Sequence, residues 1–394
     1  MASASLINAT RSKRSSTMVF LRTVSLFLLS LALSARASFR DFGIPESDAT
    51  VNVRVFDVGT TTMANAMALF VHPVPAGREN MTSSMLSFLI EHNGKRMLFD
   101  LGMRNDTQNF SPTVASYFPG LVAKLDEPNG EITGILKKAG IPLNTINAVI
   151  WSHAHFDHIG DMSKFPNSTE LIIGSETDMD TYPQVPTASL KAEDFAGRTV
   201  TKIDFSKAKM TFNGLKAIDY FGDGSFYLMD TPGHMAGHIT ALARTTKSTF
   251  IVLGADTFHH PGEVRPRPAF QQQYPCPAHL LEDAKAISTD YFWSPKSSSG
   301  AFDLASRPEQ LFAVSDTAGS FYADPVTSEI SIVKLANFDA DPEFFVLASH
   351  DISLRGAIPV FPAYLNQWKQ QNLKENSVWG FLNKSSPSFI FTAV

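Results

Sequence analysis

The sequence predicts an α/β (α+β) fold in which two packed sheets are flanked by helices. Strand-like segments occur in two runs, and segments with helical spacing follow them. No Gly/Ser-rich or charged linker divides these runs. Residues 38–394 are therefore expected to form a single domain, with an insertion near residues 260–320.

The first run of strands begins at residues 51–56, where apolar residues alternate with period two. Residues 86–91 and 96–99 are apolar and are joined through Asn93-Gly94, a dipeptide typical of a tight hairpin turn. The rest of this half is predicted to contain a helix that starts at Asn129, strands at 148–151 and 171–173, and a loop over 176–200.

The second run holds predicted strands at 210–212, 226–229, 239–243 and 250–253, and a last strand at 344–348. Residues 260–279 are rich in proline and predict an irregular segment. The spacing of Leu280, Ala284, Ile287 and Tyr291 predicts a helix after it. A final helix is expected to begin at Asp324-Pro325, with Val326, Ile330 and Val333 facing the core.

Residues 1–37 have the features of a secretory signal peptide. Basic residues precede an apolar run over 24–33, and Ala35-Arg36-Ala37 fits the small-x-small cleavage pattern. Because this run is well short of the roughly 20 residues that span a bilayer, cleavage after Ala37 is favoured over a membrane anchor. Met18 is an alternative start that would give a shorter signal.

The composition of the remaining chain disfavours some partners. Five of the 33 Lys and Arg residues and none of the 38 Asp and Glu residues lie in the first 37 positions, which leaves a net charge of −10. Nucleic acid is therefore not expected as a substrate. Cys276 is the only cysteine, so no intrachain disulfide forms. N-glycosylation sequons begin at Asn80, Asn105, Asn109, Asn167 and Asn383, which fits a secreted glycoprotein.

The segment Ser152–His158 says most about function. His153, His155, Asp157 and His158 can all bind a divalent metal, and they follow the apolar run of a predicted strand. Because a strand end holds the next loop in place, imidazoles at alternate positions can converge on one point. Neutral imidazole nitrogens and carboxylate oxygens are ligands that zinc takes at catalytic sites.

Three further candidate ligands occur later in the chain. His234, Asp256 and His350 each lie just past a strand-like run. Seven ligands suit two metal ions rather than one. Two ions about 3.5–4 Å apart can share a hydroxide and stabilise both the attacking and the leaving oxygen, and they lower the pKa of water to about 7.

The order of these pieces resembles the metallo-β-lactamase superfamily of hydrolases in its two-metal form. The His-x-His-x-Asp-His cluster, the turn Thr231-Pro-Gly-His234, Asp256 and a final His350 follow in the family's order over residues ~50–355. Within the superfamily the chain is most similar to the lactonase branch, which includes acyl-homoserine lactonases. The resemblance implies a four-layered αβ/βα sandwich with the site along one edge of the two sheets.

The resemblance also implies a role for each ligand. One zinc ion would be held by His153, His155 and His234, a second by Asp157, His158 and His350, and Asp256 would bridge both. The implied reaction is the opening of a lactone by a hydroxide that lies between the zinc ions. Asp157 would carry a proton to the leaving group as a catalytic residue. Iron, manganese and cobalt are alternatives to zinc.

Other polar residues near the predicted centre have supporting interpretations. Asp100 is expected to orient a ligand imidazole, and Asp57 is a second candidate for that task. His238 is expected to brace its loop rather than to bind metal. His259 stands three residues after the bridging aspartate, where acyl-homoserine lactonases carry a tyrosine. We predict that His259 is catalytic and donates to the substrate carbonyl or oxyanion; the alternative is a structural role.

The proline-rich segment offers candidates for substrate binding. Arg265 and Arg267 would meet a substrate carboxylate or, as is favoured, face solvent. Phe270, Tyr274 and Trp293 are predicted to form a lid or wall of the pocket, with ordinary core as the alternative.

The leading hypothesis is a secreted dizinc lactonase that acts on a small-molecule ester, lactone or lactam. A β-lactamase, a thioesterase or an arylesterase would use the same centre, because each reaction passes through a tetrahedral oxyanion. An iron-dependent redox enzyme of the same fold is an alternative of another class. No nucleic acid and no stable membrane anchor are expected, and the sequence leaves the oligomeric state open.

Overall fold

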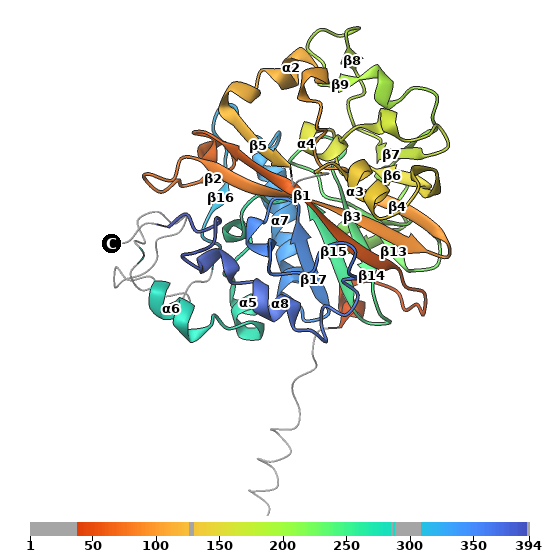
Figure 1. Ribbon diagram of the computed structural model, residues 1–394. Helices are drawn as coiled ribbons and strands as arrows, with labels where there is room; N and C mark the ends of the chain where they lie inside the picture. Colours follow the sequence, from red (N-terminus) through yellow and green to blue (C-terminus); the bar gives the residue numbers. More distant parts are fainter. Residues whose placement is uncertain (1–37, 126–129, 285–286, 288–308, 392–394) are drawn as a thin grey trace, which may run out of the picture. The chain divides into compact units, whose positions relative to one another are not determined.

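Two large β-sheets dominate the computed structural model, which describes residues 38–125, 130–284, 287 and 309–391 (Figure 1). The first sheet has seven strands in the order β10 (Val200–Ile203), β7 (Glu170–Gly174), β6 (Ala148–Ile150), β4 (Lys95–Phe99), β3 (Met81–His92), β1 (Asn52–Met63) and β5 (Leu121–Leu125). The second has six, in the order β11 (Met210–Phe212), β12 (Leu215–Asp219), β13 (Phe226–Asp230), β14 (Ile239–Arg244), β15 (Phe250–Ala255) and β17 (Phe344–Ala348).

Shorter elements surround these sheets. Two small sheets pair β16 (Ala313–Val314) with β2 (Val71–His72), and β8 (Thr181–Tyr182) with β9 (Leu190–Lys191). The described α-helices are α2 (Pro112–Ala115), α3 (Ile132–Lys138), α4 (Phe156–Ile159), α5 (Pro268–Gln273), α6 (Ala278–Ala284), α7 (Pro325–Ala340) and α8 (Leu373–Ser377). Residues Phe39–Val394 form one compact unit.

Most of the predicted strands are confirmed, and the hairpin turn of the first sheet is where the sequence places it. β3 ends at His92 and β4 begins at Lys95, with Asn93 at φ 48° and Gly94 at φ 78°. Positive φ at both turn residues is the reason for the Asn-Gly preference. β1 continues past its predicted end through a bulge at Gly59, where a Cβ would lie 2.2 Å from the carbonyl oxygen of Lys124.

The two sheets pack face to face through alternate residues of their strands. Val55 and Phe88 of the first sheet belong to the same buried cluster as Leu228, Ile251 and Phe345 of the second. Because side chains alternate across a strand, the neighbours of these residues face outward. Those neighbours contact the helices on each side.

Helices cover the outer face of each sheet. On the first sheet, Leu98 packs with Leu136 of α3 and Ile159 of α4. On the second, Phe344 packs with Leu335 of α7. The layers are therefore helix, sheet, sheet and helix, which confirms the predicted α/β (α+β) class and the four-layered αβ/βα sandwich.

The predicted inward face of α7 is wrong. The helix begins as predicted, with Asp324 accepting a hydrogen bond from the backbone N–H of Thr327. However, Val326, Ile330 and Val333 are exposed by 73%, 51% and 44%. The buried face is instead formed by Ser328, Ser331, Ile332, Leu335, Ala336, Phe338 and Asp339.

Close approach to the turn Thr231–His234 explains this face. A Cβ on Gly233 would lie 2.3 Å from the backbone nitrogen of Ser328, and Ser331 donates to the carbonyl oxygen of Pro232 at 2.7 Å. Small serines let the helix approach this turn, whereas Val326 or Ile330 would be too large there. Hydrophobicity alone therefore selected the wrong side of the helix.

Three other segments differ from the sequence analysis. Residues 260–279 contain a regular helix, α5, and residues 176–200 contain the short strands β8 and β9. The helix predicted over 280–291 is present as α6 over Ala278–Ala284, while Tyr291 lies outside the described residues. Asn129, the predicted helix start, and the predicted signal peptide also lie outside them.

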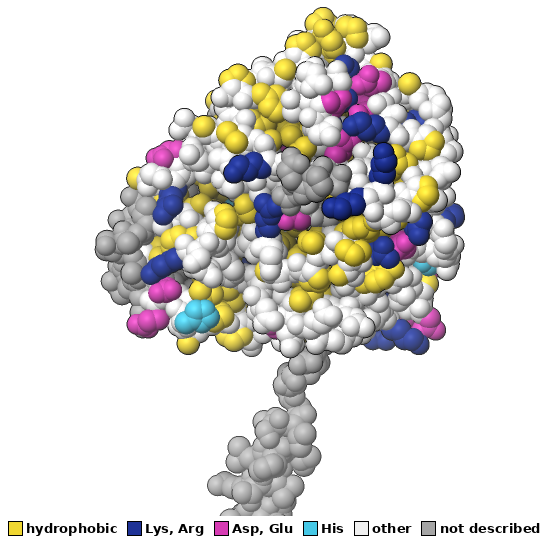
Figure 2. All heavy atoms as spheres, viewed as in Figure 1, with side chains coloured by type: hydrophobic (Ala, Val, Ile, Leu, Met, Phe, Trp, Pro, Cys, Tyr) yellow, Lys and Arg dark blue, Asp and Glu magenta, His cyan; other side chains and the backbone are white. Residues whose placement is uncertain are grey.

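One face of the molecule carries a mixture of side-chain types. Figure 2 shows basic and acidic side chains interspersed among apolar and neutral ones on this face. Among the described helices, none combines the length and the apolar character needed to cross a bilayer.

Candidate metal centre

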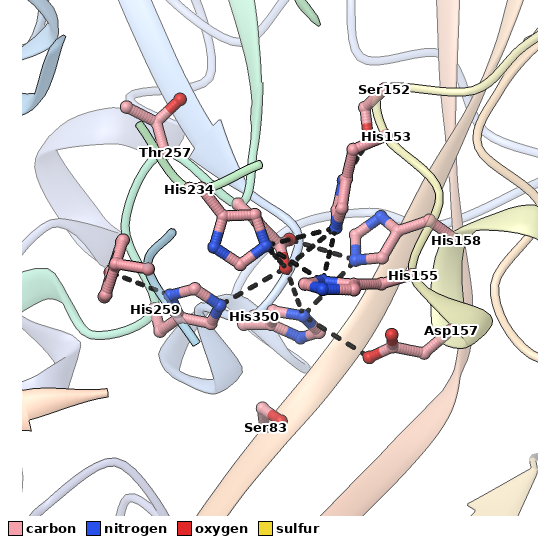
Figure 3. Close-up of polar contacts among 12 residues, drawn as sticks. Ser83, Ser152, His153, His155, Asp157, His158, His234, Thr257, His259 and His350 are labelled. Carbon is pink, nitrogen blue, oxygen red and sulfur yellow. Dashed lines mark hydrogen bonds and ion pairs between the residues drawn. The ribbon is translucent and has the colours of Figure 1, made fainter. Parts of the chain in front are cut away.

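The seven predicted ligands meet at the ends of four strands (Figure 3). β6 leads into the loop that carries His153 and His155 and into α4, which carries Asp157 and His158. β13 precedes His234, β15 ends immediately before Asp256, and β17 precedes His350. Because β13, β15 and β17 run in one direction in the second sheet, their carboxyl ends lie at the same edge.

Three histidine nitrogens form the first group with Asp256. His153 Nε2 lies 2.9 Å from His155 Nδ1, and His234 Nε2 lies 3.2 Å and 3.0 Å from these two atoms. Asp256 Oδ2 lies 3.6 Å from His153 Nε2 and 3.4 Å from His234 Nε2. All four ligand atoms lie within 4.8 Å of one another.

The second group shares Asp256 with the first. Asp256 Oδ1 lies 3.0 Å from His158 Nε2, and Asp256 Oδ2 lies 3.1 Å from His350 Nε2. His350 Nε2 is also 3.4 Å from His158 Nε2 and 3.5 Å from Asp157 Oδ2. Asp256 therefore lies between the two groups, as expected of a bridging carboxylate.

The donor set fits metal ions. Burial lowers the pKa of His155 to about 4 and lowers the pKa values of His153 and His234 well below their usual range. Neutral imidazoles carry one hydrogen each, so the three contacts among these ring nitrogens cannot all be hydrogen bonds. A cation that accepts their lone pairs removes this conflict.

Neighbouring polar groups fix the orientation of the rings. Asp100 accepts from His158 Nδ1 at 2.9 Å, from the Ser152 hydroxyl at 2.8 Å and from the Ser152 backbone N–H at 2.7 Å. His350 Nδ1 donates to the carbonyl oxygen of Ser84 at 2.8 Å. The contact predicted between Asp100 and a histidine of the cluster is therefore present, and it turns His158 Nε2 toward Asp256.

Asp57 and His238, two further residues predicted to support the centre, make different contacts. Asp57 does not reach the cluster; its Oδ2 accepts from Arg355 Nε at 2.7 Å. His238 contacts Thr231 Oγ1 through Nδ1 at 2.9 Å and accepts from the backbone N–H of Asp256 through Nε2 at 3.2 Å. His238 thus braces the segment that presents Asp256, as predicted.

His259 lies beside the seven residues and faces them. Its Nε2 lies 3.3 Å from Asp256 Oδ2, and its Nδ1 lies 2.8 Å from the hydroxyl oxygen of Tyr322. Tyr322 in turn donates to Glu263. Neither Tyr322 nor Glu263 was predicted from the sequence. Only the short spacing from His259 to Glu263 could have drawn attention to Glu263.

A cavity of about 430 Å³ opens onto the cluster. Asp157, His155, His234, Asp256, His259 and His350 are part of its lining. Apolar side chains form much of the remaining wall: Met63, Leu69, Phe70, Val114, Tyr117, Phe156, Met235 and Phe321. Among its described lining residues there is no Lys or Arg. A larger hollow of about 630 Å³ lies elsewhere, near Glu131 and Lys164, and does not contain any of the seven residues.

Phe270 and Tyr274 do not line the pocket, and the alternative interpretation, ordinary core, is confirmed for both. Both are buried in a separate apolar cluster with Trp379, whose ring lies 5.4 Å from that of Phe270. Trp293 lies outside the described residues. The aromatic wall is formed instead by residues such as Phe70 and Phe321, which the sequence pattern did not single out.

Both interpretations of Arg265 are wrong, because it is buried in an ion pair. Its Nε and one terminal nitrogen donate to Asp339 at 2.7 Å and 2.8 Å, and its other terminal nitrogen donates to the carbonyl oxygen of Val378 at 2.8 Å. Arg267 is half-buried and donates to the carbonyl oxygen of Val264. Cys276 is half-buried and is not in a disulfide.

Comparison with known proteins identifies relatives of the chain. Residues 84–275 match the metallo-beta-lactamase superfamily. The chain is 35% identical over 355 residues to the metallo-hydrolase mfmC of Annulohypoxylon moriforme, covering 88% of this chain and 90% of that protein. It is 33% identical over 356 residues to the gamma-lactamase FDB1 of Fusarium pseudograminearum, covering 87% and 84%.

Solved structures show the same fold. An N-acyl homoserine lactone hydrolase, with the product N-hexanoyl-L-homoserine bound at its catalytic metal centre, superposes with a TM-score of 0.51. The match covers 80% of this chain and 99% of that chain at 18% identity. At this level of identity the similarity concerns the fold alone.

Proposed function

This chain belongs to the metallo-β-lactamase superfamily of hydrolases, and on that premise we propose that it opens a cyclic ester, a lactone, with two zinc ions. The observation that carries the proposal is the pair of ligand groups that share Asp256. His153, His155 and His234 would hold one ion, and Asp157, His158 and His350 the other. The metal identity and the lactone substrate are parts of the proposal.

The chemistry follows from the donor set and from the residues around it. Bound zinc would make an attacking hydroxide available near neutral pH and would polarise the scissile carbonyl. Asp157 is half-buried and lines the cavity, so its carboxylate is placed to pass a proton to the leaving oxygen. Asp100 holds His158 in orientation throughout.

The cavity supports a substrate without a negative charge. Its described lining has no Lys or Arg to pair with a substrate carboxylate, and much of its wall is apolar. Burying an unpaired carboxylate there would be costly. We therefore propose a neutral lactone with an apolar substituent that packs against residues such as Phe70 and Phe321.

A cyclic amide is the second candidate. The relative FDB1 is named a gamma-lactamase and shares 33% identity with this chain. Opening a γ-lactam uses the same centre, since it also passes through a tetrahedral oxyanion. Thioesterase and arylesterase activities would use it as well, and an iron-loaded redox enzyme is the candidate of another class.

A direct experiment tests the proposal. Purified protein is incubated with neutral lactones, the matching lactams and acyclic esters, before and after removal of metal by a chelator. We expect lactone opening to be lost with the metal and to return with zinc at two equivalents per chain. Full turnover after metal removal would contradict a metal-dependent hydrolase. Iron in the purified protein together with no turnover of any lactone, lactam or ester would favour the redox class.

Secretion and glycosylation remain predictions from residues 1–37 and the five sequons. All five sequon asparagines are exposed, which leaves them accessible to modification. N-terminal sequencing of the protein recovered from the culture medium of an expressing eukaryotic cell is expected to begin at Ser38. Recovery of the uncleaved chain from the cell alone would contradict a signal peptide.

A further inference from the structure

His259 is held on both sides of its ring. Toward the cluster, Nε2 lies 3.3 Å from Asp256 Oδ2, and the ring stacks on that of His350 with centroids 5.2 Å apart and an interplanar angle of 13°. Away from the cluster, Nδ1 lies 2.8 Å from the Tyr322 hydroxyl (Figure 3 shows His259 facing the other histidines). The side chain is 2% exposed, so water does not solvate either nitrogen.

The hydrogen-bond chain behind His259 links its tautomer to the ionisation of Glu263. Tyr322 donates its hydroxyl hydrogen to Glu263 Oε1 at 2.7 Å. Glu263 Oε2 accepts from the backbone N–H groups of His259 and His260, each at 2.8 Å. Burial raises the pKa of Glu263 to about 8, and a cation at the centre would counter this by stabilising the carboxylate. An ionised carboxylate only accepts, so in the metal-loaded protein the single hydrogen of Tyr322 lies toward Glu263. The oxygen of Tyr322 must then accept the hydrogen of His259 Nδ1.

This tautomer leaves a lone pair on His259 Nε2. A neutral ring that carries its hydrogen on Nδ1 can only accept through Nε2. That lone pair points at a carboxylate oxygen of Asp256, which is also an acceptor. Two acceptors 3.3 Å apart in a buried site repel each other unless a cation lies between them. Asp256, His259 and His350 indeed form a third group whose ligand atoms lie within 4.8 Å.

The neighbouring histidines have the same arrangement. His158 directs Nδ1 at Asp100 and Nε2 at Asp256, and His350 directs Nδ1 at the carbonyl oxygen of Ser84 and Nε2 at Asp256. A metal-binding histidine characteristically donates its other ring N–H in this way. His259 reproduces the pattern, with Tyr322 and Glu263 in the place of Asp100.

We propose that His259 is an additional ligand of the metal centre through Nε2, and that Tyr322 and Glu263 are positioning residues that hold the required tautomer. This proposal rests on the two-zinc centre proposed above. In this tautomer His259 does not donate a hydrogen bond to the substrate, so its role differs from the one predicted from sequence. A bound cation also favours the ionised form of Glu263, because positive charge nearby stabilises a carboxylate.

Metal affinity tests this proposal independently of turnover. Zinc dissociation is measured by competition with a chromophoric chelator, and the absorption of the cobalt-loaded protein reports its coordination. The variants are His259→Phe, which keeps an aromatic ring, and Tyr322→Phe, which removes only the hydroxyl. His260→Gln is the matched control, because His260 Nε2 bonds to the carbonyl oxygen of Ser388 and the ring does not face Asp256.

We expect His259→Phe to weaken one of the two zinc equivalents by at least about 10-fold, and Tyr322→Phe to weaken the same equivalent by about 10-fold. The cobalt spectrum is expected to change in His259→Phe, whereas His260→Gln is expected to keep both the affinity and the spectrum of the wild type. Unchanged affinity and spectrum in a folded His259→Phe protein would overturn the proposal for His259. Wild-type protein that binds no zinc would instead overturn the metal centre itself.

The tautomer of His259 can also be measured directly in the wild-type protein. In zinc-loaded protein labelled with ¹⁵N-histidine, His259 is expected to show a protonated Nδ1 and a metal-shifted Nε2. A hydrogen found on Nε2 would contradict the proposal, even if His259→Phe does not fold.

Discussion

The cluster around Asp256 and the ion pair between Arg265 and Asp339 both bury charged groups, yet they match donors and acceptors differently. Arg265 places three nitrogens on three oxygens, two of Asp339 and one of Val378. Lys374, nearby, donates to the carbonyl oxygens of Asp339, Asp341 and Phe344. Each side-chain nitrogen of Arg265 and Lys374 therefore donates to at least one oxygen acceptor.

The region around Asp256 is different because its ring nitrogens lie so close together that their contacts cannot all be hydrogen bonds. Ring nitrogens of His153, His155 and His234 converge within 3.2 Å, and Asp256 lies among the histidines. Buried charge alone therefore does not identify a functional site. A set of lone pairs that only a cation can satisfy is the more specific sign.

Substitution of Asp256 is expected to reduce activity most strongly. In Asp256→Asn the bridging charge is lost, and we expect lactone opening to fall by about 10³-fold, on the scale seen when a group that stabilises transition-state charge is removed. Initial rates and zinc content, measured on protein whose circular dichroism is unchanged, check this. Wild-type rates in a variant that has lost zinc would show that the cluster around Asp256 is not a catalytic metal centre.

Arg265→Met tests whether the buried ion pair with Asp339 stabilises the fold without affecting the metal centre. It leaves the carboxylate of Asp339 buried without its partner, which is expected to cost about 3–5 kcal/mol of unfolding free energy. Denaturant unfolding measures the loss, and zinc content per folded chain is expected to stay unchanged. The double variant Arg265→Met with Asp339→Leu is the control and should regain much of the stability. A loss of zinc in the folded single variant would show that the two regions are not separate.

Asp100→Asn tests a hydrogen-bond partner of a ligand histidine at the edge of the metal centre. The amide keeps the size of the side chain but weakens the acceptor for His158 Nδ1. We expect zinc affinity to fall by about 10–100-fold, as for other partners of ligand histidines. Chelator competition measures the effect, with Asp57→Asn as the control because Asp57 pairs with Arg355 instead. Equal losses in both variants would argue against a specific role for Asp100.

The smallest change in stability is expected at Asp194, a buried carboxylate with both a like-charged and an oppositely charged neighbour. Burial and the neighbouring Asp161 raise the pKa of Asp194 to about 7, although Arg104 acts in the opposite direction. The folded state therefore holds this proton more tightly than the unfolded state, and stability falls as the pH rises from about 4 to about 7.

Asp194→Asn removes this ionisation. We expect the variant to be more stable than the wild type by about 1–2 kcal/mol at pH 8 and to show a flatter dependence of stability on pH. Thermal unfolding from pH 4 to pH 8 checks both expectations. A variant less stable than the wild type at pH 8 would show that neighbouring groups stabilise the ionised carboxylate of Asp194 in the folded state.

The strands and the residues that follow them can be predicted from local sequence. Period-two alternation and the Asn93-Gly94 turn are local features, because side-chain direction and backbone φ depend on neighbouring residues alone. Asp256 and His350 lie directly beyond apolar strands, so the order of residues along the chain is enough to place them at a sheet edge. The resemblance to a known family then predicted that the ligands at these strand ends meet in one two-metal site.

The side chains that complete the site depend on tertiary packing. His259 meets Tyr322 across 63 residues of sequence, and Arg265 meets Asp339 across 74. No spacing rule relates such positions, because their contact depends on how sheets and helices pack. The same packing turned the serine face of α7 inward and left Val326 in solvent. Local chemistry therefore fixed where ligands follow strands, while packing geometry selected their partners.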